Sequence, residues 1–165
     1  MEKTNIAYVA GLFDGEGSIS IGRGRVKRGS TKLYLKYTVQ VSITQSRDKG
    51  KQILEDLQKK FGGTASEITK YFENRKDRKT SFQHYRWRLG NQTAYKFLCQ
   101  IYLYSKIKKE QIILAAEFQE ILNSYSKKTS PSEIERIEKF SYYETAKREM
   151  SFLNGQKVKK ISWMK

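Results

Sequence analysis

The sequence predicts an α+β domain whose strands are antiparallel. Two periodicities alternate along the 165 residues: some segments repeat apolar residues at helical spacing, and others repeat them at every second position. In chain order they give a helix, a hairpin, a helix, a second hairpin, two more helices and a C-terminal helix. This length and order favour one domain. We divide it into a core over residues 1–125 and a C-terminal helical and basic extension over residues 126–165.

The first hairpin carries the clearest strand pattern. A short helix precedes it over residues 4–13, with Thr4 or Asn5 as its N-cap. The period changes to two at Gly17, and after a turn-like stretch over residues 23–30 the alternation becomes regular. The polar residues of the alternation are expected on a solvated face. The apolar row expected on the buried face comprises Leu33, Leu35, Tyr37, Val39, Val41 and Ile43.

The second helix and hairpin follow directly. Ser46 or Asp48 can cap a helix that ends at Gly62-Gly63. The next strand is expected around residues 65–72. A charged loop then leads to a return strand, in which apolar Tyr85, Trp87 and Leu89 alternate with polar His84, Arg86 and Arg88.

Three helices complete the chain. Apolar spacing predicts two of them, over about residues 93–102 and 108–123. The last helix is expected to begin at the sequence Ser-Pro-Ser-Glu, with Ser130 as the N-cap and Glu133 completing a capping box.

The net charge narrows the class of partner. Thirty-three Lys and Arg oppose 17 Asp and Glu, which gives a formal charge of +16. Such an excess makes a compact chain repel itself, so it points to a polyanion, and nucleic acid leads. No apolar run is long enough to span a bilayer and the N-terminus does not resemble a signal peptide, so no membrane partner is expected. The lone Cys99 has apolar neighbours and is expected to be a buried thiol in a reducing compartment.

The positive charge gathers on the two hairpins. Residues 18–49 contain eight basic residues and one acid, and residues 70–88 contain seven basic residues and two acids. A two-stranded ribbon fits the major groove of DNA, where Arg, Lys and Gln can read base edges. An ordinary solvated sheet face is the alternative, and the paired basic hairpins make it the weaker one.

The stretch Asp14-Gly15-Glu16-Gly17 ends the first apolar helix in two carboxylates between glycines. Glycine lets the backbone turn sharply there, which leaves carboxylate and carbonyl oxygens free to reach an ion. Mg²⁺ is held by one or two carboxylates with water and phosphate, and it can activate water for phosphodiester hydrolysis. On pattern alone, a helix end that simply enters a hairpin remains open as an alternative.

Small residues line one side of the first helix. Ala7, Gly11 and Gly15 recur at every fourth position, which permits close approach of another helix. Because the chain contains one copy of the motif, the partner could be the same helix of a second subunit. The alternative is that Gly11 packs against the sheet of its own subunit.

The nine residues from Val9 to Gly17, VAGLFDGEG, closely resemble the motif that names the LAGLIDADG homing endonucleases. The resemblance covers roughly residues 4–125 and implies an αββαββα fold, whose antiparallel sheet forms a DNA-binding saddle, plus the C-terminal helix. The single motif resembles the homodimeric branch, in which the motif helices form the dimer interface. The implied reaction is Mg²⁺-dependent cleavage of both DNA strands, leaving short 3′ overhangs. Mn²⁺ is an alternative ion, and Ca²⁺ is expected to bind without supporting cleavage.

The resemblance also implies roles for individual residues. Glu16 matches the metal ligand, although Asp is commoner there, and Gly15 matches the carbonyl ligand. Asp14 matches an acid that looks structural. Gln45 matches a residue that organises the hydrolytic water. The matching basic catalytic residues are Lys49 and Lys108, with Lys106 or Lys109 as alternatives in register for the second.

The expected DNA contacts lie on the hairpins. A lone His84 beside Arg86 and Arg88 is more readily a DNA contact than a metal ligand. The complete predicted set is Ser20, Arg23, Arg25, Lys32, Tyr34, Lys36, Thr38, Gln40, Ser42, His84, Arg86 and Arg88.

The resemblance leads to a function and leaves one rival. The expected protein is a homodimeric, site-specific homing endonuclease that acts on a long pseudo-palindromic duplex and promotes intron mobility. It would work inside the cell, in the cytoplasm of a prokaryote or phage host, or in a mitochondrion or chloroplast. The alternative is a non-cleaving nucleic-acid binder on the same scaffold, such as an RNA maturase or a DNA-binding regulator. A basic ribosome-associated protein would explain the charge but not the acidic motif.

Overall fold

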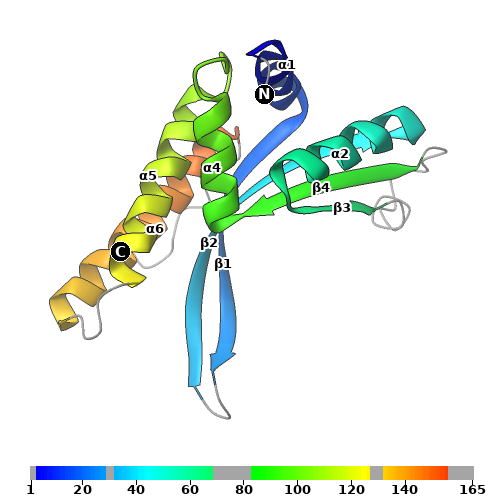
Figure 1. Ribbon diagram of the computed structural model, residues 1–165. Helices are drawn as coiled ribbons and strands as arrows, with labels where there is room; N and C mark the ends of the chain where they lie inside the picture. Colours follow the sequence, from blue (N-terminus) through cyan, green and yellow to red (C-terminus); the bar gives the residue numbers. More distant parts are fainter. Residues whose placement is uncertain (1–2, 29–31, 69–82, 127–131, 156–165) are drawn as a thin grey trace.

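The computed structural model describes residues 3–28, 32–68, 83–126 and 132–155 of the chain (Figure 1). The predicted order of elements is confirmed as αββαββα followed by two further helices. The elements are α1 (Lys3–Glu16), β1 (Gly17–Arg28), β2 (Lys32–Ser46), α2 (Arg47–Phe61), β3 (Thr64–Glu67), β4 (His84–Gly90), α4 (Asn91–Ile101), α5 (Lys109–Ser126) and α6 (Glu133–Leu153).

The four strands form one antiparallel sheet in the order β1-β2-β4-β3. The register pairs Gly17 with Ile43 between β1 and β2, and Ile43 with Trp87 between β2 and β4. The first hairpin extends well past the other strands, so its far half projects from the body of the molecule (Figure 1).

The core lies between one face of this sheet and the helices. The alternating apolar residues of β1, β2 and β4 are buried there, with Val39, Val41, Ile43 and Trp87 at 0% exposure. Phe97 of α4 makes edge-to-face contacts with the rings of Phe13 and Trp87, at centroid distances of 5.4 and 5.1 Å. Edge-to-face packing is a geometry that aromatic pairs prefer. These contacts join the end of α1 to the middle of the sheet.

Two expectations for the first hairpin were wrong. The basic stretch after Gly22 was expected to be a turn, but it continues β1 as far as Arg28. Leu35 was expected in the buried row, but it is 47% exposed. Both differences have one cause: the hairpin is longer than the core beneath it. Leu35 borders an open hollow that Leu122 of α5 and Phe140 of α6 also line, so it stays half exposed.

The helix ends differ from the predictions in detail. Glycine ends α2 as expected, since Gly62 has a φ of 76°. The capping box of α6 lies two residues later than predicted: Ser132 Oγ accepts from the Glu135 backbone, and the Glu135 carboxylate accepts from Ser132 N–H. Sequence reasoning chose Ser130 because Pro131 suits a first helical turn; both residues lie outside the described ranges.

Cys99 is exposed, which corrects the prediction of a buried thiol. The buried side of α4 consists of Ala94, Phe97, Leu98 and Ile101, and Cys99 falls on the opposite side of that helix. Among the described helices, none has the length and apolar character needed to cross a membrane.

Candidate nucleic-acid interface and metal centre

Asp14 anchors the last turn of α1 to the loop before α5. Its carboxylate is 8% exposed and accepts a 2.5 Å bond from Ser105 Oγ. It also accepts from the backbone N–H groups of Lys106 at 2.6 Å, and of Ile107 and Lys108 at 3.2 Å each. These N–H groups precede the first turn of α5, where donors lack helical partners and the helix dipole favours an anion. Asp14 therefore joins α1 to α5.

The same contacts determine the charge state of Asp14. Burial alone would raise the pKa of the carboxyl, but the hydrogen bonds from Lys106, Ser105, Ile107 and Lys108 outweigh it and lower the pKa below its ordinary value of 3.8. Asp14 is therefore ionised at neutral pH. Its oxygens are occupied by protein donors, which gives it the structural role implied by the motif.

Glu16 is placed differently from Asp14, two residues further along the chain. It is the last residue of α1, it is exposed, and β1 begins immediately after it. A Cβ at Gly17 would overlap both the ring and the carbonyl oxygen of Phe13, so only glycine fits at this junction. The close approach brings the start of β1 under the end of α1 and leaves Glu16 at the surface.

Lys108 reaches the same helix end. Its ammonium donates a 2.5 Å bond to the backbone oxygen of Asp14, one residue before Gly15 and two before Glu16. Of the alternatives in register, Lys106 donates its backbone N–H to Asp14 and is exposed, and the ammonium of Lys109 lies 5.4 Å from the ring centroid of Tyr102. A cation at the carboxyl end of a helix is also favourable for the helix dipole.

Gln45 and Lys49 lie at the junction of β2 and α2. Ile43 of β2 pairs with Gly17, the residue that follows α1. Gln45 comes two positions after Ile43 and therefore lies near the end of α1. Gly50 of α2 is buried, and a Cβ there would come 2.7 Å from Gln45 Cβ. This contact shows that Gln45 points towards α2 instead of joining the polar row of β2. Lys49 is exposed in the first turn of α2.

The row of small residues on α1 faces open space. Ala7, Gly11 and Gly15 are exposed, and a Cβ at either glycine would meet nothing within 4 Å. Tyr8, beside this row, is 60% exposed. The alternative that Gly11 packs against its own sheet is therefore excluded.

The face of the sheet opposite the core is polar across its strands. One rung aligns Ser18, Ser42, Arg88 and Thr64, and Ser18 Oγ lies 3.0 Å from Ser42 Oγ. On further rungs Arg86 Nε donates to Thr44 Oγ1 at 3.3 Å, and Ser46 Oγ lies 2.9 Å from His84 Nδ1. The register brings these predicted contacts onto this one face: Ser20, Lys36, Thr38, Gln40, Ser42, His84, Arg86 and Arg88.

Four predicted contacts do not join that set. Arg23 and Arg25 alternate with Ser20 and lie on the other face of β1; Arg23 makes an ion pair with Glu144 of α6 at 2.9 Å. Lys32 and Tyr34 belong to β2, but their side chains lie outside the described part of the structure. The period of two predicted correctly which face of the sheet the described β2 residues occupy. The same period puts Arg23 and Ser20 on opposite faces, but the sequence prediction treated Arg23 as part of a turn.

The predicted set of contacts omits further polar residues on this face. Ser18 and Thr44 alternate with buried Ile19 and Ile43, and Thr64 and Ser66 flank Ala65 in β3. The alternation already places Ser18 and Thr44 on the polar face, although the predicted contacts do not include them; Thr64 and Ser66 were missed.

A sequence profile of the LAGLIDADG endonuclease family matches residues 9–122, which run from the middle of α1 into α5. The chain belongs to the LAGLIDADG endonuclease family. A comparison with curated protein sequences gives no significant match.

Solved structures of homing endonucleases share the LAGLIDADG fold of this chain. I-CvuI, in complex with the I-CreI target in the presence of Mg²⁺ and with its DNA not cleaved, has a TM-score of 0.64 at 19% identity, covering 96% of this chain and 87% of that chain. Archaeal intron-encoded I-Vdi141I, complexed with DNA, has a TM-score of 0.65 at 17% identity, covering 98% and 91%. I-TnaI has a TM-score of 0.54 at 17% identity, covering 90% and 97%. At these identities the similarity establishes the fold.

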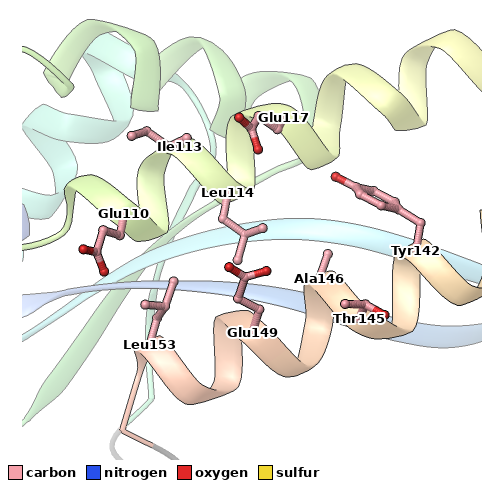
Figure 2. Close-up of a pocket in the computed structure, with 9 residues that line it drawn as sticks. All are labelled: Glu110, Ile113, Leu114, Glu117, Tyr142, Thr145, Ala146, Glu149 and Leu153. Carbon is pink, nitrogen blue, oxygen red and sulfur yellow. The ribbon is translucent and has the colours of Figure 1, made fainter.

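One hollow on the helical side of this LAGLIDADG chain is acidic. It lies between α5 and α6 and has a volume of about 350 Å³. Figure 2 shows the carboxylates of Glu110, Glu117 and Glu149 that line it, beside Leu114 and Ala146. Carboxylates repel phosphates, so this hollow is unsuited to nucleic acid. The polar sheet face, which carries Lys36, Arg86 and Arg88, is the better candidate.

Proposed function

We propose that this LAGLIDADG protein is a homodimeric, site-specific endonuclease that hydrolyses both strands of a long pseudo-palindromic duplex and leaves short 3′ overhangs. The observation that carries the proposal is the end of α1, where one exposed carboxylate, Glu16, adjoins the open row of small residues and the polar sheet face. Intron mobility is the corresponding biological role.

The dimer follows from the open face of α1. Without side chains at Gly11 and Gly15, two copies of α1 could pack with their backbones in close contact. A twofold axis through this contact would place the two Glu16 carboxylates near each other, one for each strand of the duplex. The two sheets would then continue on either side as one long polar surface.

The residues at this point fit a hard divalent cation. Glu16 supplies an exposed carboxylate and Gly15 a backbone carbonyl, whereas Asp14 is occupied by protein donors. Among the described residues, no three or more His, Cys, Asp or Glu are grouped so that they could hold a metal ion by themselves. A site with few protein ligands suits Mg²⁺, because this ion keeps water and phosphate oxygens among its ligands. When bound, Mg²⁺ would supply water activation and charge neutralisation on the leaving oxygen.

The neighbouring polar residues would position water and phosphate. We infer that Gln45 orients the attacking water and that Lys49 and Lys108 stabilise the negative charge that develops on the phosphate. The ammonium of Lys108 is bonded to the backbone carbonyl of Asp14, and Asp14 precedes Glu16 by two residues. That bond holds the end of α1 and keeps the ammonium near the reacting strand.

Sequence reading would fall to the polar face of the sheet. Gln40, Arg86 and Arg88 offer side chains that can form bidentate bonds with base edges, and Ser20, Thr38 and Ser42 suit bases or phosphates. Gln40 lies opposite Ser20, and Ser42 opposite Arg88, so adjacent strands would read adjacent positions.

The proposal is tested by selecting a preferred duplex from a randomised library with the purified protein and then adding Mg²⁺. We expect one double-strand cut with 3′ overhangs, and a binding constant that falls steeply with salt because Lys and Arg release counterions from DNA. Stable binding without a cut in Mg²⁺ or Mn²⁺ would contradict the proposed reaction. Binding to structured RNA alone would support the maturase alternative.

Gly11→Leu is expected to abolish dimerisation and cleavage together while leaving the subunit folded. A Cβ at this position meets nothing within 4 Å in its own chain, so added bulk there is expected to act on a second copy. Sedimentation measures the oligomeric state, and circular dichroism measures the fold. The control is Gln100→Leu, which places the same apolar side chain at an exposed position of α4. A Gly11→Leu protein that remains dimeric would exclude this interface.

A further inference from the structure

A single carboxylate oxygen of α6 holds both strands of the first hairpin at the same rung. Arg23 of β1 and Tyr37 of β2 lie directly opposite each other in the sheet register. Arg23 Nη1 donates to Glu144 Oε1 at 2.9 Å, and the Tyr37 hydroxyl donates to the same oxygen at 2.7 Å. Hydrogen bonds to an ionised acceptor are stronger than neutral ones, so this is a firm attachment.

The rung marks the point where the hairpin leaves the core. On the near side Ile21 and Val39 are buried, at 5% and 0% exposure. Beyond it lies the hairpin arm, residues 24–28 and 32–36, which Figure 1 shows projecting from the body. The described side chains of the arm are exposed, and Leu35, the first apolar residue past the rung, is 47% exposed. The described part of the arm borders the body at an open hollow, which Leu35 and Lys36 line together with Phe140 of α6. Close packing against the core therefore does little to fix the direction of the arm.

The backbone at the rung is unusually free to bend. Gly22 and Gly24 flank Arg23 in β1, and glycine within a strand weakens it and permits bends. A Cβ at Gly24 would meet nothing within 4 Å. The attachment to Glu144 thus falls where the strand itself resists bending least.

Glu144 is carried by an element that is firmly joined to the body. Tyr143, Ala146 and Met150 of α6 are buried in the core. Just after α6, Asn154 Nδ2 donates to the backbone oxygen of Ile19 on the edge strand β1 at 2.8 Å. A carboxylate held in this way can fix the orientation of the hairpin relative to the rest of the domain.

The charges around this oxygen keep it ionised. Burial alone would raise the pKa of Glu144, but the hydrogen bond from Tyr37 and the positive charge of Arg23 lower it below its ordinary value. In the opposite direction, burial and the bond to Glu144 raise the pKa of the Tyr37 hydroxyl to about 12, so it stays a donor at neutral pH.

We propose that Glu144 is a positioning residue that sets the direction of the hairpin arm and thereby determines which bases the arm reads at the outer ends of each half-site. The DNA part of this inference rests on the proposed function; the mechanical part does not. Glu144 lies in α6, beyond the residues 9–122 that match the family profile. A helix outside the segment that matches the family profile would thus adjust the recognition surface.

The mechanical part is tested on the free protein by distances between spin labels on Lys27→Cys in the arm and Gln52→Cys in α2, in a Cys99→Ser background. We expect a narrow distance distribution in the parent, a clearly broader one in Glu144→Ala, and an intermediate one in Glu144→Gln, which keeps an acceptor without the charge. Glu138→Ala, an exposed acid on the same helix, should match the parent. An unchanged distribution in Glu144→Ala would overturn the proposal. If that variant does not fold, an unchanged distribution in both Glu144→Gln and Tyr37→Phe would do so.

The recognition part uses the duplex that the parent selects, substituted at one base pair at a time. Glu144→Ala is expected to lose about tenfold discrimination at outer positions and none at central ones. Glu138→Ala should keep the parental profile. An equal loss at every position would overturn the recognition role. If the parent selects no duplex, the proposed function fails, and the label distances alone decide the role of Glu144.

Discussion

Glu16→Gln is expected to abolish DNA cleavage while leaving DNA binding intact. The Glu16 side chain is exposed at the end of α1. Among the contacts of the described residues, none would be broken by replacing it. An amide keeps the shape of the side chain but removes the negative charge that a divalent cation requires. We expect the rate of cleavage to fall by about 10³-fold or more, the scale on which electrostatic catalysis is lost.

The measurement combines single-turnover cleavage with fluorescence anisotropy on the same duplex. Binding without metal should be equal to or tighter than that of the parent, because a carboxylate near the scissile phosphates has been neutralised. Glu55→Gln is the matched control and should cleave normally, because Glu55 is an exposed acid of α2 whose partner among the described residues is Lys51, at 3.9 Å. A Glu16→Gln protein that cuts at the parental rate would exclude this metal site.

Asp14→Ala is expected to lower the free energy of unfolding by about 3–5 kcal/mol, since it leaves one buried and three partly buried donors without their acceptor. The orphaned groups are the Ser105 hydroxyl and the backbone N–H groups of Lys106, Ile107 and Lys108. Urea unfolding gives the value directly. Asp56→Ala removes an exposed acid with a 3.5 Å ion pair to Lys59 and should change stability by less than about 1 kcal/mol. Equal stability of the two variants would contradict the structural role of Asp14.

The stability of the conservative variant Asp14→Asn as a function of pH separates the effect of the negative charge of Asp14 from the effect of its shape. The folded pKa of Asp14 lies below its ordinary value of 3.8, so folding favours the ionised form. Its stabilisation is therefore complete above the unfolded pKa and is lost as the pH falls through the folded pKa. The stability gap between the parent and Asp14→Asn should be widest near neutral pH and should shrink below about pH 4. A gap that does not change with pH would assign the effect of the mutation to shape alone.

Local patterns predicted the elements because local chemistry determines them. The strict alternation from Tyr37 to Ile43 requires a strand with one buried face, and the structure buries its apolar members as expected. Gly62, with a φ of 76°, ends α2 because glycine adopts that backbone angle without strain. The acidic motif placed two carboxylates at a helix end, and both are found at the end of α1.

The extent of the core could not be predicted from these patterns. Leu35 continues the apolar alternation of β2 but is exposed, since burial depends on whether a distant helix covers that part of the sheet. Arg23 has the appearance of a DNA contact in a basic hairpin, yet it is paired with Glu144, which is 121 residues further along the chain. A carboxylate so far away in sequence leaves no signal near Arg23.

The same distinction separates the two acids of the motif. The sequence alone determined that a strongly basic composition and a pair of carboxylates at a helix end belong to this chain, the second through a nine-residue pattern. Only the tertiary structure decided between them: the loop before α5 surrounds Asp14 with donors and leaves Glu16 exposed. The physical reason is that the donors around a carboxylate determine its charge state and whether its oxygens are free to bind an ion. The donors around Asp14 come from residues about 90 positions away, which the packing of the whole fold brings there.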